Sequence, residues 1–192
     1  MLKDLVIRNR SYRRFKESVA IEETELLSFV DMARVTASTM NKQSLKYFTS
    51  NKVEINEEIF SCLNWAGYLK DWDGPEQGER PSAYIVILND LFIYDKPMCD
   101  YGIAAQTILL AAVEAGYGGC IIGSIDKNKL SDKLGLPGFL DVHLVVALGK
   151  PCEEVKLVEM KDTADVKYYR NEQGTHFVPK RPLSEIVVKG NK

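Results

Sequence analysis

Three arginines lie within a seven-residue segment near the start of the chain, where their chemistry suits an anionic group. The segment is NRSYRRF, residues 9–15, and it includes Arg10, Ser11 and Arg13. A guanidinium offers a planar fork of N–H donors that binds phosphate oxygens in pairs. A solvated basic helix end is the alternative, because cations favour that position. Taken alone, the segment favours the helix end, and only further motifs reverse that order.

A glycine-rich stretch, GYGGCIIG at residues 116–123, invites a nucleotide-binding interpretation. The dinucleotide pattern GxGxxG fails because Ile121 occupies the place of its last glycine. Gly118 and Gly123 have the spacing of a phosphate-binding P-loop, but Ser124 stands where that motif needs lysine. We therefore expect the glycines to end a helix and to let the next strand pass close to another segment.

Proton-transfer and metal chemistry find little support. His143 lies in a strand-like run and His176 in a charged tail, and neither has a serine or cysteine motif beside it. The four cysteines are at least 21 residues apart, so no CxxC pair is available for zinc or dithiol chemistry. We predict no metal site and a reducing compartment. An enzyme with this sequence would borrow its reactivity from an organic cofactor.

Length and composition predict one domain over residues 1–192, with an extended tail from about 152 to 192. The chain has 192 residues, of which 45% are hydrophobic, enough for one sizeable core. The net charge of −2 argues against a nucleic-acid partner. No apolar run approaches the length of a membrane span, so we expect a cytoplasmic protein without a membrane partner.

Hydrophobic periodicity predicts an alternation of helices and strands. Helical spacing covers residues 2–7, 21–35, 56–69 and 101–118, and the segment 9–15 is expected at a helix end or turn. Strand composition covers residues 45–50, 83–88, 120–124, 142–149 and 184–188. Residues 36–44 and 70–81 are expected to be loops, and 152–182 an aperiodic tail. The apolar residues of 101–118 nearly encircle that helix, which predicts burial under a sheet or against a second subunit.

The arginine segment and the loop after the second helix resemble the FMN-dependent nitroreductase family, in particular its short members. The family's pattern Arg-Ser-x-Arg-x-Phe is matched in register at Arg10, Ser11, Arg13 and Phe15. The loop TASTMNKQSLKYF, residues 36–48, resembles the second signature, which falls on Ser38, Asn41 and Gln43. Many members place Pro-Trp after that glutamine, whereas this chain has Ser44 and Leu45.

Two later segments extend the resemblance over most of the chain. Residues 101–124 resemble the central dimer helix and the glycine-bearing turn under the flavin, which carries over to Ile122, Gly123 and Ser124. KRPLSEIVV, from residue 180, resembles the C-terminal basic pair, so that Lys180 and Arg181 would complete the phosphate site.

The resemblance implies an α+β fold, a three-layer α/β/α sandwich with a mixed, mostly antiparallel sheet. It further implies a homodimer with FMN at the two-fold interface and the tail from Cys152 crossing to the partner. The implied reaction is ping-pong hydride transfer from NADH or NADPH through FMN N5 to an electron-poor acceptor such as a nitroaromatic or quinone. A flavin-binding sensor or carrier without significant turnover is the alternative. A small phosphate- or nucleic-acid-binding module is disfavoured by the acidic balance.

The chemistry of FMN asks for these residue types. Arg10 and Arg181 suit the dianionic phosphate. Arg13 is the candidate cation for the N1–C2=O edge of the ring, where reduction places negative charge. Asn41 and Gln43 offer amide groups to the ring edges. A backbone N–H near glycine 123 is expected close to N5, and the loops at residues 65–72 and 162–176 are expected to set acceptor selectivity.

Overall fold

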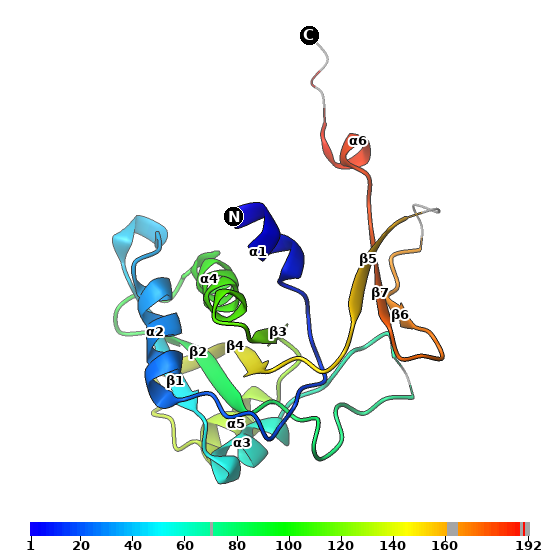
Figure 1. The fold of residues 1–192 in the computed structure, drawn as a ribbon. Helices are drawn as coiled ribbons and strands as arrows, with labels where there is room; N and C mark the ends of the chain where they lie inside the picture. The colour runs from blue at the N-terminus through cyan, green and yellow to red at the C-terminus, as the bar shows by residue number, and fades with distance from the viewer. Residues whose placement is uncertain (70, 161–164, 189, 191–192) are drawn as a thin grey trace.

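A four-stranded antiparallel sheet forms the centre of the molecule (Figure 1). The computed structural model describes residues 1–69, 71–160, 165–188 and 190. The strands follow the order β1-β2-β4-β3, with β1 at Leu45–Ser50, β2 at Ala83–Asp90, β4 at Leu140–Gly149 and β3 at Gly118–Ile122. Each neighbouring pair is antiparallel. The predicted strands at 45–50, 83–88, 120–124 and 142–149 are thereby confirmed within two residues at each end.

Helices cover both faces of this sheet, so the molecule has three layers (Figure 1). One face carries α2 (Glu23–Arg34) and α4 (Asp100–Glu114), and the other carries α3 (Val53–Phe60) and α5 (Lys127–Lys133). The α+β sandwich expected from the sequence is confirmed.

The two hydrophobic cores follow from the alternation of side chains along β2, the most buried strand. Ile85 and Ile87 pack with the α2 and α4 layer, whereas Tyr84 and Val86 pack with the α3 and α5 layer. Successive side chains of a strand point to opposite faces, so a continuous apolar run fills two cores at once. Each fully buried aliphatic side chain contributes about 1.5–3 kcal/mol relative to exposure.

The arginine segment begins at a helix end, as expected, with Asn9 as the C-cap of the first helix, and then continues as extended chain. Helix α1 (Leu2–Arg8) stops before it, and Asn9 has extended backbone dihedrals. Ser11 then forms a parallel bridge with Gly119, and the Tyr12 amide donates to the Gly119 carbonyl at 3.0 Å. This pairing with β3 competes with continued helix, because the backbone groups find partners in another strand.

Close packing around β3 and β4 explains why glycines stand there. A Cβ at Gly119 would lie 2.4 Å from the Ala147 carbonyl oxygen, and one at Gly118 would lie 2.6 Å from the Tyr12 ring. A side chain at either position would push the arginine segment or β4 out of place. The expected role of these glycines, close passage of a strand past another segment, is confirmed.

Replacing Gly119 with alanine is therefore expected to lower the free energy of unfolding by about 1–3 kcal/mol through overpacking. Urea denaturation of the purified variant measures this change. Gly123→Ala is the matched control, because its Cβ would meet only Leu144 Cδ2 at an ordinary 3.6 Å. Equal stability of the two variants would contradict the packing argument.

The C-terminal part of the chain forms a second, three-stranded sheet (Figure 1). Its order is β5-β7-β6, with β5 at Val155–Glu159, β7 at His176–Lys180 and β6 at Tyr169–Arg170. The β5–β7 pair is parallel and the β6–β7 pair antiparallel, so the strands as a whole are mixed and mostly antiparallel. These strands were not expected within the aperiodic sequence of residues 152–182, because neighbouring strands supply a register that each short segment lacks by itself.

Four further elements differ from the sequence prediction. Helix α3 covers 53–60 instead of 56–69, because Asn64 N–H donates to the Ser124 carbonyl at 3.0 Å and Leu63 bridges Ile125. Residues 183–186 form a helical turn, α6 (Leu183–Ile186), where a strand over 184–188 was expected, since this segment pairs with no described strand. Helix α5 was not expected, and α4 ends at Glu114 rather than at 118.

Among the described residues, no helix has the length and apolar character needed to span a bilayer.

Candidate functional site

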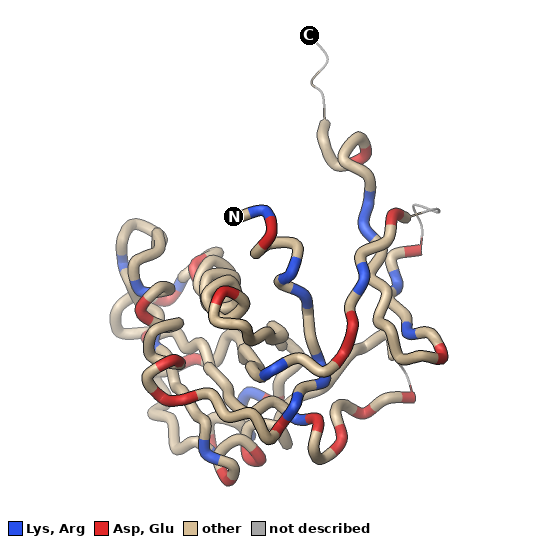
Figure 2. Tube along the Cα trace, viewed as in Figure 1, with Lys and Arg blue, Asp and Glu red and all other residues tan. Residues whose placement is uncertain are grey.

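A basic cavity of about 310 Å³ lies where the arginine segment faces the C-terminal sheet. Its lining includes Arg10, Ser11 and Arg13 from the N-terminal segment and Lys180 from β7. Lys and Arg residues occur along the N-terminal segment and along the C-terminal sheet that faces it (Figure 2). Four of the residues singled out in the sequence, from opposite ends of the chain, thus meet around one space.

The Arg10 guanidinium is held by one hydrogen bond and keeps unpaired hydrogen-bond donors. Its Nη2 donates to the Val6 carbonyl at 2.6 Å, while its buried Nε has no hydrogen-bond partner among the described residues. Burial lowers the pKa of Arg10 from its ordinary value. A partly desolvated cation with an unused donor attracts an anion more strongly than an exposed cation does.

Arg13 and Arg14, adjacent in sequence, have different surroundings. The Arg13 guanidinium lies 4.8 Å from the ring centre of Tyr168 in the C-terminal part of the chain. Its Nη1 donates to the Ser11 carbonyl at 3.3 Å, within the cavity wall. Arg14 forms a two-pronged ion pair with Glu79, whose Oε2 accepts from Nε at 2.6 Å. The charge of Arg14 is therefore paired with a carboxylate of the protein, whereas the guanidinium of Arg13 lines the cavity.

Glu153 joins the arginine segment to the C-terminal sheet. Its side chain is 1% exposed and accepts from the backbone amides of Arg13 at 2.5 Å and Arg14 at 3.2 Å. Its other oxygen accepts from Arg170 Nη2 at 3.0 Å. Glu153 was not predicted from the sequence, since a glutamate in a charged stretch carries no pattern that separates a buried carboxylate from an exposed one.

His176 also lines the cavity, although the sequence offered no reason to prefer it. It is 1% exposed, it stacks against Tyr168 with ring centres 5.2 Å apart, and neither ring nitrogen has a partner among the described residues. Burial, with Arg13 and Arg170 adding to it, lowers the pKa of His176 to about 4. The imidazole is therefore neutral at pH 7 and presents one donor and one acceptor. His143 of β4, in contrast, is partly exposed and stacks on Tyr101 of α4.

The lowered pKa of His176 predicts a loss of stability in acid. Because the unfolded chain binds the proton near pH 6.5 and the folded chain only near pH 4, the free energy of unfolding falls as pH drops through that window. The loss amounts to about 3 kcal/mol at most. Urea denaturation at pH 7.5 and pH 4.5 measures it, and in His176→Gln the difference between the two pH values should shrink. Equal pH dependence in both proteins would contradict the assignment.

Ser38, Asn41 and Gln43, which form the other group of expected residues, lie in a strained loop that packs against the first turn of α4. This loop contains the 3-10 turn η1 (Thr39–Asn41), in which Met40 and Asn41 have φ values of 51° and 53°, and Gln43 follows at 53°. Positive φ costs free energy for residues other than glycine and clusters at functional sites. The buried carboxylate of Asp100 secures the loop, accepting from the Thr39 amide at 2.9 Å and its hydroxyl at 2.8 Å. Asp100 lies in the first turn of α4, directly after the N-cap residue Cys99. Its hydrogen bonds to Thr39 therefore join the loop to this helix.

Ser38 and Gln43 line a separate cavity of about 150 Å³ beside Asp100. The Ser38 hydroxyl accepts from the Gln43 amide at 3.2 Å, and Gln43 Nε2 donates to the Asn41 carbonyl at 3.2 Å. This loop and helix α1 lie on opposite sides of α4 (Figure 1). Within one chain, the structure does not bring Ser38, Asn41 and Gln43 to the cavity that holds Arg10.

The remaining expected residues lie at the ends of β3 and β7 or directly after them. Ile122 is buried, whereas Gly123 and Ser124 are exposed after the last residue of β3, next to the partly exposed Ile121 that lines the basic cavity. Arg181 follows Lys180 but pairs with Glu185 of α6. It does not line the basic cavity.

An aromatic wall lies beside the basic cavity. Tyr168 borders the cavity and also a shallow depression of about 480 Å³ that it shares with Tyr68, Trp72 and Arg170. The Tyr68 and Tyr168 ring centres are 5.0 Å apart, and the Arg170 guanidinium lies 4.4 Å from the Trp72 ring centre. The two loops expected to set selectivity, 65–72 and 162–176, therefore meet, although residues 70 and 162–164 lie outside the described residues.

Comparisons with known proteins agree with this architecture. The model of the Nitroreductase family matches residues 7–150. A nitroreductase family protein from Streptococcus pneumoniae TIGR4 has a similar structure, with a TM-score of 0.71 and 16% identity over 99% of this chain and 100% of that one. An FMN-dependent nitroreductase from Clostridium difficile R20291 gives a TM-score of 0.68 and 19% identity over 98% of both chains.

A third similar structure, from Exiguobacterium sibiricum 255-15, was solved in complex with FMN. It gives a TM-score of 0.66 and 16% identity over 79% of this chain and 89% of that one. At these identities the structures establish the fold. The family match covers three quarters of the sequence, including the arginine segment and the loop before β1. The chain belongs to the nitroreductase family.

Proposed function

We propose that this protein binds FMN and is an NAD(P)H-dependent oxidoreductase that reduces electron-poor acceptors such as nitroaromatics or quinones. The observation that carries the proposal is the basic cavity in which Arg10, Ser11 and Arg13 meet Lys180. Three cations and an unused buried Arg10 donor form a set that suits a phosphate dianion. When bound, FMN would supply hydride uptake from NADH or NADPH and hydride delivery to the acceptor.

Different residues of this chain would contact different parts of FMN. Arg10 and Lys180 would bind the phosphate, with Arg181 reaching it if its pair with Glu185 opens. Arg13 would place a cation at the N1–C2=O edge of the ring and so favour the reduced anion. Residues Ile122, Gly123 and Ser124, at the end of β3, would present backbone groups to the other edge.

We further propose that the active form is a homodimer. The loop with Ser38, Asn41 and Gln43 lies across α4 from the basic cavity, so one cofactor would contact both groups only if a second copy supplied the loop (Figure 1). The strain at Met40, Asn41 and Gln43 supports a binding role for that loop.

The C-terminal arm supports the same arrangement. Beyond β7 the chain projects away from the body with α6 and exposed Leu183, Ile186 and Val188 (Figure 1). Apolar side chains on a projecting segment favour a contact with a partner surface. We propose that this arm crosses to the second subunit. Light scattering coupled to size exclusion tests the dimer, with a mass of twice 21.7 kDa expected.

The acceptor would meet the aromatic wall formed by Tyr68, Trp72 and Tyr168. Electron-rich rings stack well with planar, electron-poor compounds, and Arg170 adds a cation beside them. Proton supply would come from solvent, so no side chain needs to act as a general acid or base.

The decisive experiment records the visible absorbance of protein purified without added cofactor and then adds NADH or NADPH under anaerobic conditions. A flavin band that bleaches, and returns when a quinone or nitroaromatic is added, is the expected result. A flavin band that neither nucleotide bleaches would favour a sensor or carrier. A colourless protein that fails to take up added FMN would overturn the proposal.

A further inference from the structure

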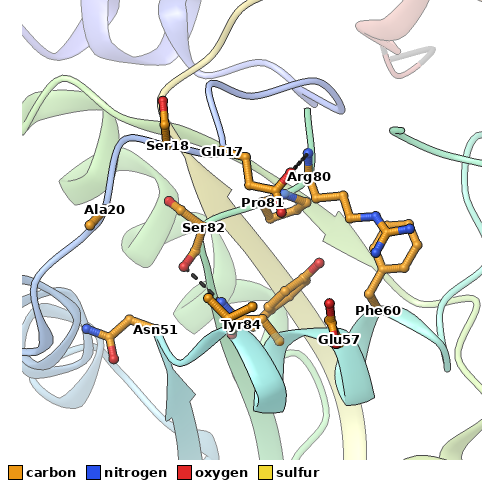
Figure 3. Close-up of a pocket in the computed structure, with 12 residues that line it drawn as sticks. Glu17, Ser18, Ala20, Asn51, Glu57, Phe60, Arg80, Pro81, Ser82 and Tyr84 are labelled. Atoms are coloured by element: carbon orange, nitrogen blue, oxygen red, sulfur yellow. Dashed lines mark hydrogen bonds between the residues drawn. The ribbon is translucent and has the colours of Figure 1, made fainter. Parts of the chain in front are cut away.

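A second pocket, of about 130 Å³, lies on the α3 side of the central sheet (Figure 3). It is formed by residues 17–20, by α3 with the residues before it, and by the start of β2. Of its lining residues, Ser18 and Ala20 are exposed, whereas Asn56, Ser82 and Tyr84 are buried. None of these residues belongs to the cofactor site proposed above.

Four buried polar atoms around this pocket have no hydrogen-bond partner among the described residues. They are Asn56 Oδ1, Ser82 Oγ, the Tyr84 hydroxyl and Arg80 Nε. The Asn56 side chain is oriented by its Nδ2, which donates to the Ser82 carbonyl at 2.9 Å and leaves Oδ1 as a free acceptor. Buried polar groups nearly always have partners, so four around one cavity indicate a missing occupant.

The charges around the pocket favour an uncharged occupant. An anion would meet the carboxylates of Glu17 and Glu57, and a cation would meet the Arg80 guanidinium. That guanidinium lies 4.3 Å from the ring centre of Phe60 and forms no ion pair within the described part of the chain. Three of the four buried groups, those of Asn56, Ser82 and Tyr84, are neutral, and a neutral guest avoids the large cost of desolvating a charge.

We propose that this pocket binds a small uncharged carboxamide with an apolar body. The carboxamide carbonyl would accept from the Tyr84 hydroxyl or Arg80 Nε–H, and its N–H would donate to Asn56 Oδ1. Phe60 and Pro81 would contact the apolar body. Burial raises the pKa of Tyr84 well above its ordinary value, so its hydroxyl stays protonated and able to donate. The proposal does not depend on flavin binding.

The first test titrates benzamide into the ¹⁵N-labelled full-length protein and follows the backbone amide resonances. Saturable shifts confined to residues 17–20, 51–60 and 80–84 are expected. Benzoate has a similar shape with a charge, and acetophenone has the carbonyl without N–H. Both are expected to bind at least about tenfold more weakly, the value of one lost hydrogen bond. Absence of a saturable shift, or equal binding of all three probes, would overturn the proposal.

The second test uses Tyr84→Phe, which removes one orphan hydroxyl without changing the ring. Benzamide binding is expected to weaken about tenfold, while the urea midpoint stays unchanged because no protein hydrogen bond is lost. Tyr117→Phe removes a hydroxyl that donates to Glu25 at 3.0 Å, outside the pocket, and should leave benzamide binding unchanged. A lower urea midpoint in Tyr84→Phe with unaltered benzamide binding would mean that ordered water alone satisfies these groups, and the proposal would fall.

Discussion

Replacing Arg10 with glutamine is expected to weaken FMN binding about 10- to 100-fold, which corresponds to one lost charge-assisted phosphate contact. The expectation rests on the unused, buried Nε of Arg10 and on its position in the cavity with Arg13 and Lys180. Flavin fluorescence quenching during titration of apoprotein measures the dissociation constant. Riboflavin, which lacks the phosphate, should bind the variant as well as it binds the unaltered protein.

Arg8→Gln is the matched control for this experiment. Arg8 lies two residues away, is exposed and pairs with Asp4 at 3.0 Å one helical turn earlier, and it does not line the cavity. Its replacement should change FMN affinity little, since exposed ion pairs and distant exposed charges have small effects. If Arg10→Gln weakened FMN and riboflavin equally, its effect would be structural. If it weakened neither, the phosphate would bind elsewhere.

Replacing Glu153 with alanine is expected to lower the free energy of unfolding by about 3–5 kcal/mol. The carboxylate is buried and accepts from Arg170 and from two backbone amides of the arginine segment, so its loss leaves a nearly buried guanidinium and two N–H groups without an acceptor. Urea denaturation at neutral pH measures the change. Glu153→Gln keeps an acceptor oxygen but loses the charge, so its effect should be intermediate.

Glu154→Ala provides the comparison at the next position in the chain. Glu154 is exposed, and it pairs with Lys156 at 3.1 Å and accepts from the Thr175 hydroxyl at 3.0 Å. Its removal should lower the free energy of unfolding far less than removal of Glu153, because exposed ion pairs contribute little. Similar losses for the two variants would show that burial of Glu153 does not make it the link between the arginine segment and the C-terminal sheet.

The two glutamates also show where sequence interpretation stops. They are adjacent, chemically identical and set in the same charged stretch, yet one is 1% exposed in its side chain and the other 59%. Burial of a charge depends on which segments pack against it. Those segments, 13–14 and 170, lie far away in the chain, so no local pattern could separate the two residues.

The same limit applies to the histidines. The sequence placed His143 in a strand and His176 in a tail, and neither had a neighbouring motif. The structure pairs β7 with β5 and β6 and so brings His176 beside Arg13 and under Tyr168. Parallel and long-range strand pairing is decided by tertiary contacts, because short isolated strands have no stable register.

Local chemistry and periodicity determined a large part of this protein from the sequence alone. The apolar runs at 83–88 and 142–149 could satisfy two buried faces only as central strands, and the three arginines of residues 9–15 marked a candidate site for an anion. These features depend on residues close in the chain, so their pattern is readable there. Only the tertiary structure decided that the arginine segment is extended along β3, that helix α3 ends at Phe60, and that Lys180, His176 and Glu153 gather around that segment. Each depends on hydrogen bonds and burial contributed by residues distant in sequence.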